Sequence, residues 1–223
     1  MSDPYSFWPL FDLVVRTPRL EIRLPKEYEF GALLQLVEDG IHDPNAMPFT
    51  VPWTDVALPQ RERESAQWWW RQRAEWTANK WSFTGAVFVD GTVVGVQDLM
   101  ATNFAQVRSV ETGSWLGQRH QGQGLGKEMR QAILHLAFAG LGAEEAHSGA
   151  FVDNAASLAT SRAIGYEENG TELGARRNGV DPVVKLRIDR TAWGQRWRND
   201  IEIVGLDRCV DMFIGSSKTE DGA

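Results

Sequence analysis

The chain has 223 residues, of which 43% are hydrophobic and 24% charged, and this ordinary composition excludes collagen-like, disordered and disulfide-scaffold proteins. Its 23 Lys and Arg against 30 Asp and Glu give a net charge of −7, which excludes a uniform basic field for nucleic acid or an anionic membrane. Because it has one cysteine, no apolar run near the roughly 20 residues of a membrane span and no secretory signal, we expect a cytoplasmic domain with appendages.

The first third of the chain predicts one strand and two helices. Residues 19–24 alternate apolar and polar side chains as a half-buried strand does, and residues 27–37 have apolar positions at helical spacing before Gly40. Residues 41–59 contain four prolines and form a long loop. A second helix is expected over 61–79, with tryptophans that we expect to pack in the core or an interface: Trp68, Trp69, Trp70 and Trp76.

The middle of the chain predicts an antiparallel meander of three strands. Residues 82–89 and 92–99 are β-rich, and Asp90 and Gly91 between them are a strong hairpin signal. Residues 108–116 are expected to form the third strand.

The last part predicts a glycine loop at 117–124, a long helix, a strand at 145–152, a helix at 155–164, and two strands at 166–172 and 183–188. This order favours an α/β (α+β) fold: a mixed, mostly antiparallel sheet with helices on both faces. We expect a domain over residues 1–189 and a C-terminal extension over 190–223. The extension would pack on the domain or at an oligomer interface, with a frayed end.

The loop QRHQGQGLGK, residues 118–127, is the most informative stretch, because it has three glycines at alternate positions before a helix. Glycines let the backbone approach a ligand, and the N-terminal N–H groups of a helix attract phosphate. A dinucleotide fingerprint is excluded by Lys127, and a P-loop is excluded by Gln121 and Glu128. A simple glycine-rich connection is the alternative.

The sequence of this loop resembles the Q/R-x-x-G-x-G/A signature of the GNAT acyltransferase superfamily, through Gln121, Gly124 and Gly126. The resemblance covers about residues 16–189. ETGSWL, residues 111–116, resembles the E-x-G-x-W-L strand of the RimJ/RimL branch, and NAAS, residues 154–157, resembles its N-x-x-S motif. HDPNAMPF and SWLG also make the chain similar to a mycobacterial member described as a succinyltransferase.

The resemblance implies a GNAT fold with a splayed strand pair at an acyl-coenzyme A site. It implies that the loop backbone holds the coenzyme pyrophosphate and that the pantetheine lies along the strand before it; these residues are Gln121, Gly122, Gln123, Gly124, Leu125 and Gly126, with Trp115, Leu116 and Gly117. It further implies that Asn154 contacts the coenzyme and that Ser157 lies near its sulfur. Asn154 is equally suited to cap a helix, and Ser157 to be an ordinary first-turn serine.

Acyl transfer to an amine needs a base, because an ammonium group cannot attack a thioester. An α-amine has a pKa of about 7.8 and a lysine about 10.4, so the lysine is harder to neutralise at pH 7. Glu111, on the strand that leads into the loop, is the first candidate base, and a solvated strand carboxylate is the alternative. His120 is the second candidate, and it could instead be a counter-charge beside phosphate. His42 and Asp43 could help shape the acceptor site, and a turn at Asp43 and Pro44 is the favoured alternative.

These observations predict an acyl-coenzyme A-dependent N-acyltransferase that uses direct attack in a ternary complex, without a metal. The donor is acetyl-coenzyme A by default or succinyl-coenzyme A, whose carboxylate would need a cation such as Arg108, Arg119 or His120. The acceptor is a protein α-amine, a lysine or a small molecule, and a homodimer or larger homo-oligomer is expected. The alternatives are a non-catalytic acyl-coenzyme A sensor and an oligomerisation protein with a vestigial loop.

Overall fold

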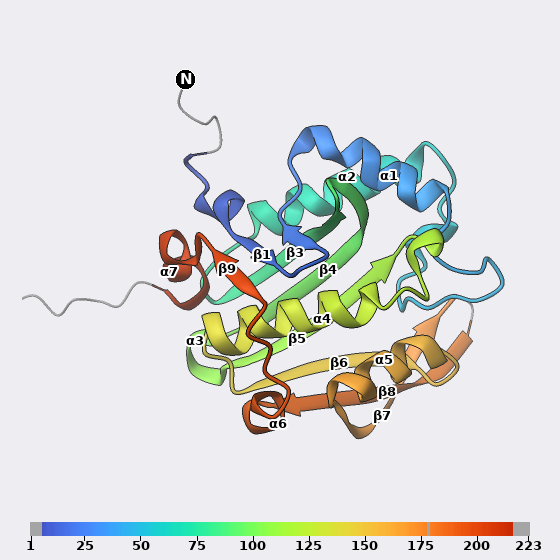
Figure 1. Cartoon of the computed structure of the whole chain (residues 1–223). Helices are drawn as coiled ribbons and strands as arrows, with labels where there is room; N and C mark the ends of the chain where they lie inside the picture. Colours follow the sequence, from blue (N-terminus) through green and yellow to red (C-terminus); the bar gives the residue numbers. More distant parts are fainter. Residues whose placement is uncertain (1–5, 178, 216–223) are drawn as a thin grey trace, which may run out of the picture.

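The protein, seen here as a computed structural model that describes residues 6–177 and 179–215, contains a nine-stranded sheet in the order β7-β8-β6-β5-β4-β3-β2-β1-β9 (Figure 1). The strands are β1 (Val14–Arg16), β2 (Glu21–Arg23), β3 (Lys80–Val89), β4 (Thr92–Thr102), β5 (Ser109–Leu116), β6 (Glu145–Phe151), β7 (Glu167–Arg176), β8 (Gly179–Asp189) and β9 (Glu202–Val204). Among these strands, β5 and β6 are parallel and the other neighbours are antiparallel. The expected mixed, mostly antiparallel sheet is confirmed.

The helices cover both faces of the sheet (Figure 1). They are α1 (Phe30–Glu38), α2 (Gln60–Ala74), α3 (Phe104–Val107), α4 (Leu125–His135), α5 (Ala155–Ile164), α6 (Arg190–Gly194) and α7 (Val210–Ile214). On one face, α1 and α2 pack Phe30, Leu33 and Trp69 on β3 and β4. On the other face, α4 and α5 cover the larger core. We call the first of these the α1/α2 face and the second the α4/α5 face.

The hairpin between β3 and β4 forms where its sequence predicted it. Asp90 has a φ of 48° and Gly91 a φ of 74°, so both central residues are left-handed. This conformation suits the right-handed twist of the strands and explains the Asp-Gly pair. The β3–β4–β5 meander is therefore confirmed.

Of the three adjacent tryptophans of α2, one lies in the core, and an interface role for the two exposed ones stays a prediction. Trp69 is 6% exposed, whereas Trp68 is 38% and Trp70 51% exposed. Consecutive helical residues point about 100° apart, so only one of three adjacent tryptophans can face the sheet.

The predicted extent of α2 is wrong at its C-terminal end. The helix ends at Ala74 rather than at residue 79, and a turn joins the Thr77 and Lys80 backbones where β3 begins.

Residues after β8 contribute to the same sheet and core. β9 pairs antiparallel with β1 and forms the sheet edge beyond it. The backbone carbonyl of Phe213 accepts a hydrogen bond from Trp81 Nε1 at 3.0 Å, and Trp193, Cys209 and Phe213 are buried. The end that we expected to be frayed, residues 216–223, lies outside the described residues.

Candidate active site

The parallel strands β5 and β6 separate halfway along their length. Their register ends at Glu111 opposite His147, while β5 stays paired with β4 as far as Leu116. Beyond the last pair, the Thr112 hydroxyl donates to the His147 carbonyl at 3.1 Å, and the Ser148 hydroxyl donates to the Thr112 carbonyl at 3.3 Å. Side chains thus replace the backbone ladder beyond Glu111, and we call the region between β5 and β6 that has no backbone pairing the opening.

The open side of β5 offers backbone groups to a ligand. The Thr112 carbonyl faces β6, and the Leu116 carbonyl accepts a bond from the side chain of Gln121 rather than from β4. Because backbone groups alternate sides along an antiparallel strand, the N–H and C=O of Ser114 face the same opening. An extended ligand with amide groups could pair there as an added strand.

The glycine loop joins the end of β5 to α4. Gly122 has a φ of 72° and Gly124, which precedes the first residue of α4, a φ of 78°, so both occupy the left-handed region that favours glycine. Gln121 Nε2 donates to the carbonyls of Ile41 and Leu116, both at 2.9 Å, which ties the loop to its surroundings. The first N–H groups of α4 have no partner within the helix, and the N-cap residue Gly124 has no side chain to cap them, which leaves donors of the kind that bind phosphate.

Arg19 reaches this loop from the turn between β1 and β2. Its Nη1 donates to the Gln123 carbonyl at 3.1 Å, and its Nε donates to the Glu128 carboxylate at 2.6 Å. The Thr17 hydroxyl holds the other oxygen of Glu128. Sequence reasoning missed Arg19, because 104 positions separate it from Gln123 and no local pattern marks it. A half-exposed cation therefore lies beside the proposed phosphate loop.

The first turn of α5 begins directly after β6. Asn154 caps this helix, because its side-chain oxygen accepts a bond from the Ser157 N–H at 3.2 Å. The N-cap alternative is thus observed. Contact of Asn154 with a coenzyme and a place for Ser157 near its sulfur stay predictions.

The predicted bases lie toward opposite ends of β5. Glu111 is exposed on the α1/α2 face and lies beside the point where the parallel pairing ends. His120 lies beyond the other end of the strand, where its Nε2 accepts a bond from Arg119 Nε at 3.0 Å. Partial burial, with Arg119 nearby, lowers the pKa of His120. His147 lies on the paired side of the opening and is bonded to Glu145 Oε1 at 3.0 Å.

Asp98 is a second carboxyl group near the opening that sequence reasoning missed. It lies on β4 opposite Gly113 of β5 and Thr84 of β3, so the three residues share the α1/α2 face. Its Oδ1 is buried without a hydrogen-bond partner among the described residues. Burial raises the pKa of Asp98 to about 7, against a lowering by the bond from Thr84.

Asp98→Asn is expected to stabilise the protein at alkaline pH. A carboxyl whose folded-state pKa is raised binds its proton more tightly when folded, so its contribution to stability is complete below pH 4 and is lost as pH rises through about 7. Because one pKa unit corresponds to about 1.4 kcal/mol, the variant should gain up to about 4 kcal/mol over the parent at pH 8 and little at pH 4. Urea unfolding at both pH values measures the difference, and an equal difference at both would contradict the shift.

Arg130 is a buried cation on the α4/α5 face of the same opening. It is 4% exposed, donates to the hydroxyls of Ser114 on β5 at 2.9 Å and Ser148 on β6 at 3.2 Å, and also contacts Ser161. Its Nε is buried with no partner in the described part of the chain, and no carboxylate there forms an ion pair with it. A buried charge held only by neutral hydroxyls is costly unless an anion completes the site.

The proline-rich loop brings aromatic rings to the α1/α2 face. His42, Phe49, Trp53 and Trp115 form a row with successive ring centroids 5.6, 5.5 and 6.1 Å apart. The expected turn at Asp43 is confirmed, since its carboxylate accepts a bond from the Asn45 N–H at 2.8 Å.

The hairpin between β7 and β8 holds the proline-rich loop from the other side of the opening. Arg177 contacts both carboxylate oxygens of Asp55, at 2.8 and 3.0 Å, and Arg176 donates to the Met47 carbonyl at 2.7 Å. These bonds connect the two sides of the splayed sheet across a candidate acceptor site.

Cys209 is unsuited to nucleophilic chemistry. It is buried at the far sheet edge, and burial raises the pKa of its thiol to about 12. Within residues 6–177 and 179–215, no three His, Cys, Asp or Glu side chains are grouped to hold a metal ion. In the same part of the chain, none of the helices is long and apolar enough to cross a membrane.

Comparisons with known proteins agree with this geometry. Residues 19–167 match the family model described as an acetyltransferase (GNAT) domain. The chain is similar to Mycobacterium smegmatis RimJ in complex with CoA-disulfide, with 17% identity, a TM-score of 0.70 and coverage of 91% of this chain and 94% of that one. It is similar to RimL, a ribosomal L7/L12 α-N-protein acetyltransferase in complex with coenzyme A, with 20% identity, a TM-score of 0.63 and coverage of 80% and 99%. It is also similar to an N-acetyltransferase from Staphylococcus aureus Mu50, with 18% identity, a TM-score of 0.59 and coverage of 77% of this chain and 98% of that one.

Proposed function

Because the chain belongs to the GNAT acetyltransferase family, we propose that it transfers an acyl group from coenzyme A to a primary amine by direct attack in a ternary complex. The observation that carries this proposal is the opening between β5 and β6, which begins at Glu111 and leads to a glycine loop at the N-terminus of α4. The loop would bind the anionic end of the donor, and the open edge of β5 its amide arm.

The residues proposed to bind coenzyme A follow this path. The backbone of Gln121, Gly122, Gln123, Gly124, Leu125 and Gly126 would surround the pyrophosphate. Arg19, which is paired with Glu128, lies beside Gln123 with its guanidinium half exposed at the edge of this loop. The amide arm would lie along Trp115, Leu116 and Gly117, while Asn154 and Ser157 would close the opposite side from α5.

The reaction requires a neutral amine and a departing thiolate. Glu111 is the proposed base, because it is exposed where the pairing of β5 and β6 ends. Ser157 would donate a proton to the leaving sulfur. His120 stays the second candidate base; its lowered pKa keeps it neutral at pH 7, but it lies beyond the far end of β5.

The proposed acceptor is the α-amine of a protein. RimL, which shares the fold, is an α-N-protein acetyltransferase, and an α-amine costs less to neutralise than a lysine. The aromatic row that ends at Trp115 would border the acceptor. The test of this proposal is to assay a panel of peptides and small amines for release of free thiol and to measure coenzyme binding by calorimetry. Coenzyme binding without thiol release for every amine would favour the non-catalytic acyl-coenzyme A sensor. The predicted homo-oligomer stays a prediction that sedimentation would test.

Arg130 favours a succinyl donor over an acetyl donor. The cations first considered for a succinyl carboxylate are engaged elsewhere: Arg119 pairs with Asp39, and Arg108 donates to the Leu141 carbonyl. Arg130 instead bridges β5 and β6 at the opening without a counter-charge. A carboxylate on the acyl group would supply that charge.

Arg130→Met is therefore expected to lower the ratio of kcat/KM for succinyl-coenzyme A to that for acetyl-coenzyme A at least about tenfold, the effect of one lost charge-assisted bond. Arg119→Met, which removes an exposed cation, is the matched control and should leave the ratio unchanged. Steady-state kinetics with both donors measure it. An unchanged ratio in Arg130→Met would leave acetyl as the donor.

A further inference from the structure

The acyl acceptor must lose two protons on its way from an ammonium ion to an amide. The first must leave before the nitrogen can attack, and the second leaves after attack, from the cationic nitrogen of the tetrahedral intermediate. Glu111 is placed to accept the first proton, because its side chain is exposed and can exchange protons with water. A second proton acceptor would lie deeper, close to the carbon that is attacked.

Asp98 occupies such a place. Its register partner on β5 is Gly113, two residues beyond Glu111 and next to Ser114, whose backbone faces the opening. Gly113 has no side chain to cover it: a Cβ at this position would lie 3.5 Å from Asp98 Oδ2. The carboxyl group of Asp98 therefore lies over the uncovered face of Gly113, and the opening lies on the other edge of the same strand.

We propose that Asp98 accepts the second proton of the acceptor amine, across the space left by Gly113. The inference rests on the proposed acyl transfer. In this step the N–H bond breaks and an O–H bond forms on Asp98, the C–S bond breaks, and the thiolate leaves with its electron pair and takes a proton from Ser157. The proton held on Asp98 then returns through water to the Ser157 oxygen, so both side chains regain their starting states. The balance is amide, thiol and one proton released to water.

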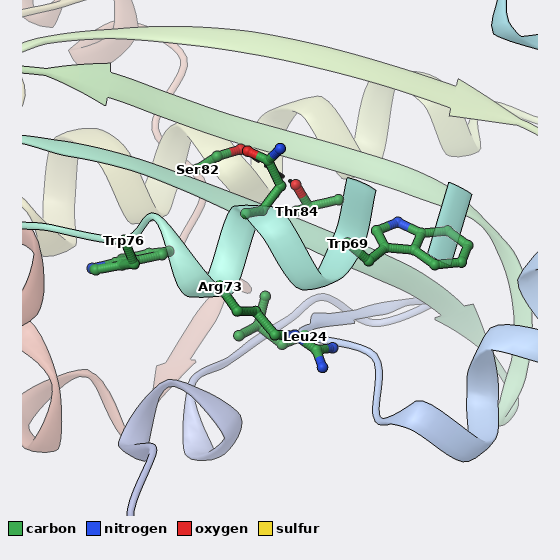
Figure 2. Close-up of a pocket in the computed structure, with 7 residues that line it drawn as sticks. Leu24, Trp69, Arg73, Trp76, Ser82 and Thr84 are labelled. Carbon is green, nitrogen blue, oxygen red and sulfur yellow. Dashed lines mark hydrogen bonds between the residues drawn. The ribbon is translucent and has the colours of Figure 1, made fainter. Parts of the chain in front are cut away.

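The surroundings of Asp98 suit a group that must both take up and release a proton. Thr84 on β3 is the register partner of Asp98 and lowers its pKa, and the Ser82 hydroxyl lies 3.3 Å from the Thr84 hydroxyl. Figure 2 shows Ser82 and Thr84 with Trp69, Arg73 and Trp76 among the residues that line a small pocket beside α2. Neighbouring elements bring charged groups to this face: Lys80 on β3, Glu111 on β5, His147 on β6 and Arg73 on α2, whose guanidinium contacts Glu27. Burial and the Thr84 bond set the pKa of Asp98 near neutrality, where a general base works best.

The two carboxyl groups predict different kinetic signatures. Asp98→Asn should lower kcat about 100-fold with coenzyme binding unchanged, equally for an α-amine and a lysine, and raising the pH should not rescue it. The loss of kcat in Glu111→Gln should depend on the acceptor, and alkaline pH should restore part of it. Asp200→Asn, at an exposed aspartate paired with Arg198, is the control and should keep the parent kcat.

Thr84→Val supplies a signature that a structural role would not produce. The Thr84 bond lowers the pKa of Asp98, so its loss should raise that pKa and move the acid limb of the kcat profile to higher pH. Gly113→Ala should lower kcat at least about tenfold with normal folding, because its Cβ meets Asp98 and Met100 only at ordinary contact distances. Thermal unfolding of Asp98→Asn from pH 4 to 8 reports the titration without any substrate.

The outcomes separate this inference from the function on which it rests. An active parent enzyme with a parent-like kcat in Asp98→Asn, or with an unmoved acid limb in Thr84→Val, would overturn the role of Asp98 alone. A parent that binds coenzyme A but transfers no acyl group to any amine would overturn both. Acceptor-independent loss in Asp98→Asn, together with a moved acid limb in Thr84→Val, would establish the role.

Discussion

Gly124→Val is expected to reduce the affinity for coenzyme A at least about 100-fold, because it removes a close backbone approach to phosphate. Gly124 has a φ of 78°, and a Cβ there would lie 3.4 Å from Arg19 Nη2, the cation beside the loop. A β-branched residue in this region costs the backbone about 1–2 kcal/mol, less than the stability of a typical domain. Calorimetric titration with coenzyme A measures the affinity.

Gly91→Val is the matched control for this change. Gly91 has a similar φ of 74° but lies in the β3–β4 hairpin, where a Cβ would have no neighbouring atom within 4 Å. It should lose similar stability and keep its coenzyme affinity. Parent-like binding by a folded Gly124→Val variant would remove the loop from the proposed site.

Glu111→Gln is expected to lower kcat by about 10²–10⁴, the range for loss of a general base, while coenzyme binding stays unchanged. Gln keeps the shape of the side chain on β5 but cannot take a proton. The decrease in kcat should be larger with a lysine acceptor than with an α-amine, because more of the lysine is charged at pH 7. Raising the pH to 9.5 should restore part of the rate, since the free amine then forms in water.

Stopped-time assays from pH 6.5 to 9.5 with both acceptors measure this dependence. Glu172→Gln, at an exposed glutamate on β7 paired with Lys185, is the control and should match the parent. A parent-like kcat in Glu111→Gln at every pH would move the first proton transfer to His120 or to water.

Local signals in the sequence predicted the elements whose conformation depends on a few neighbouring residues. Asp90 and Gly91 specify a left-handed turn, so the hairpin between β3 and β4 formed where expected. The same applies to α5, which covers the expected residues 155–164 and begins at its cap Asn154. The glycine loop also belongs to this class, because the φ of Gly124 and the start of α4 follow from adjacent positions.

The tertiary structure alone decided which distant residues meet at the opening. Arg19, Asp98 and Arg130 have ordinary local surroundings in the sequence, and their importance arises from contacts across strands: Arg19 with Gln123, Asp98 with Gly113, and Arg130 with Ser114 and Ser148. The same holds for β9, which pairs with β1 almost the whole chain length away. A periodic pattern records which face of an element is buried, but register and burial of charge depend on what packs against that face.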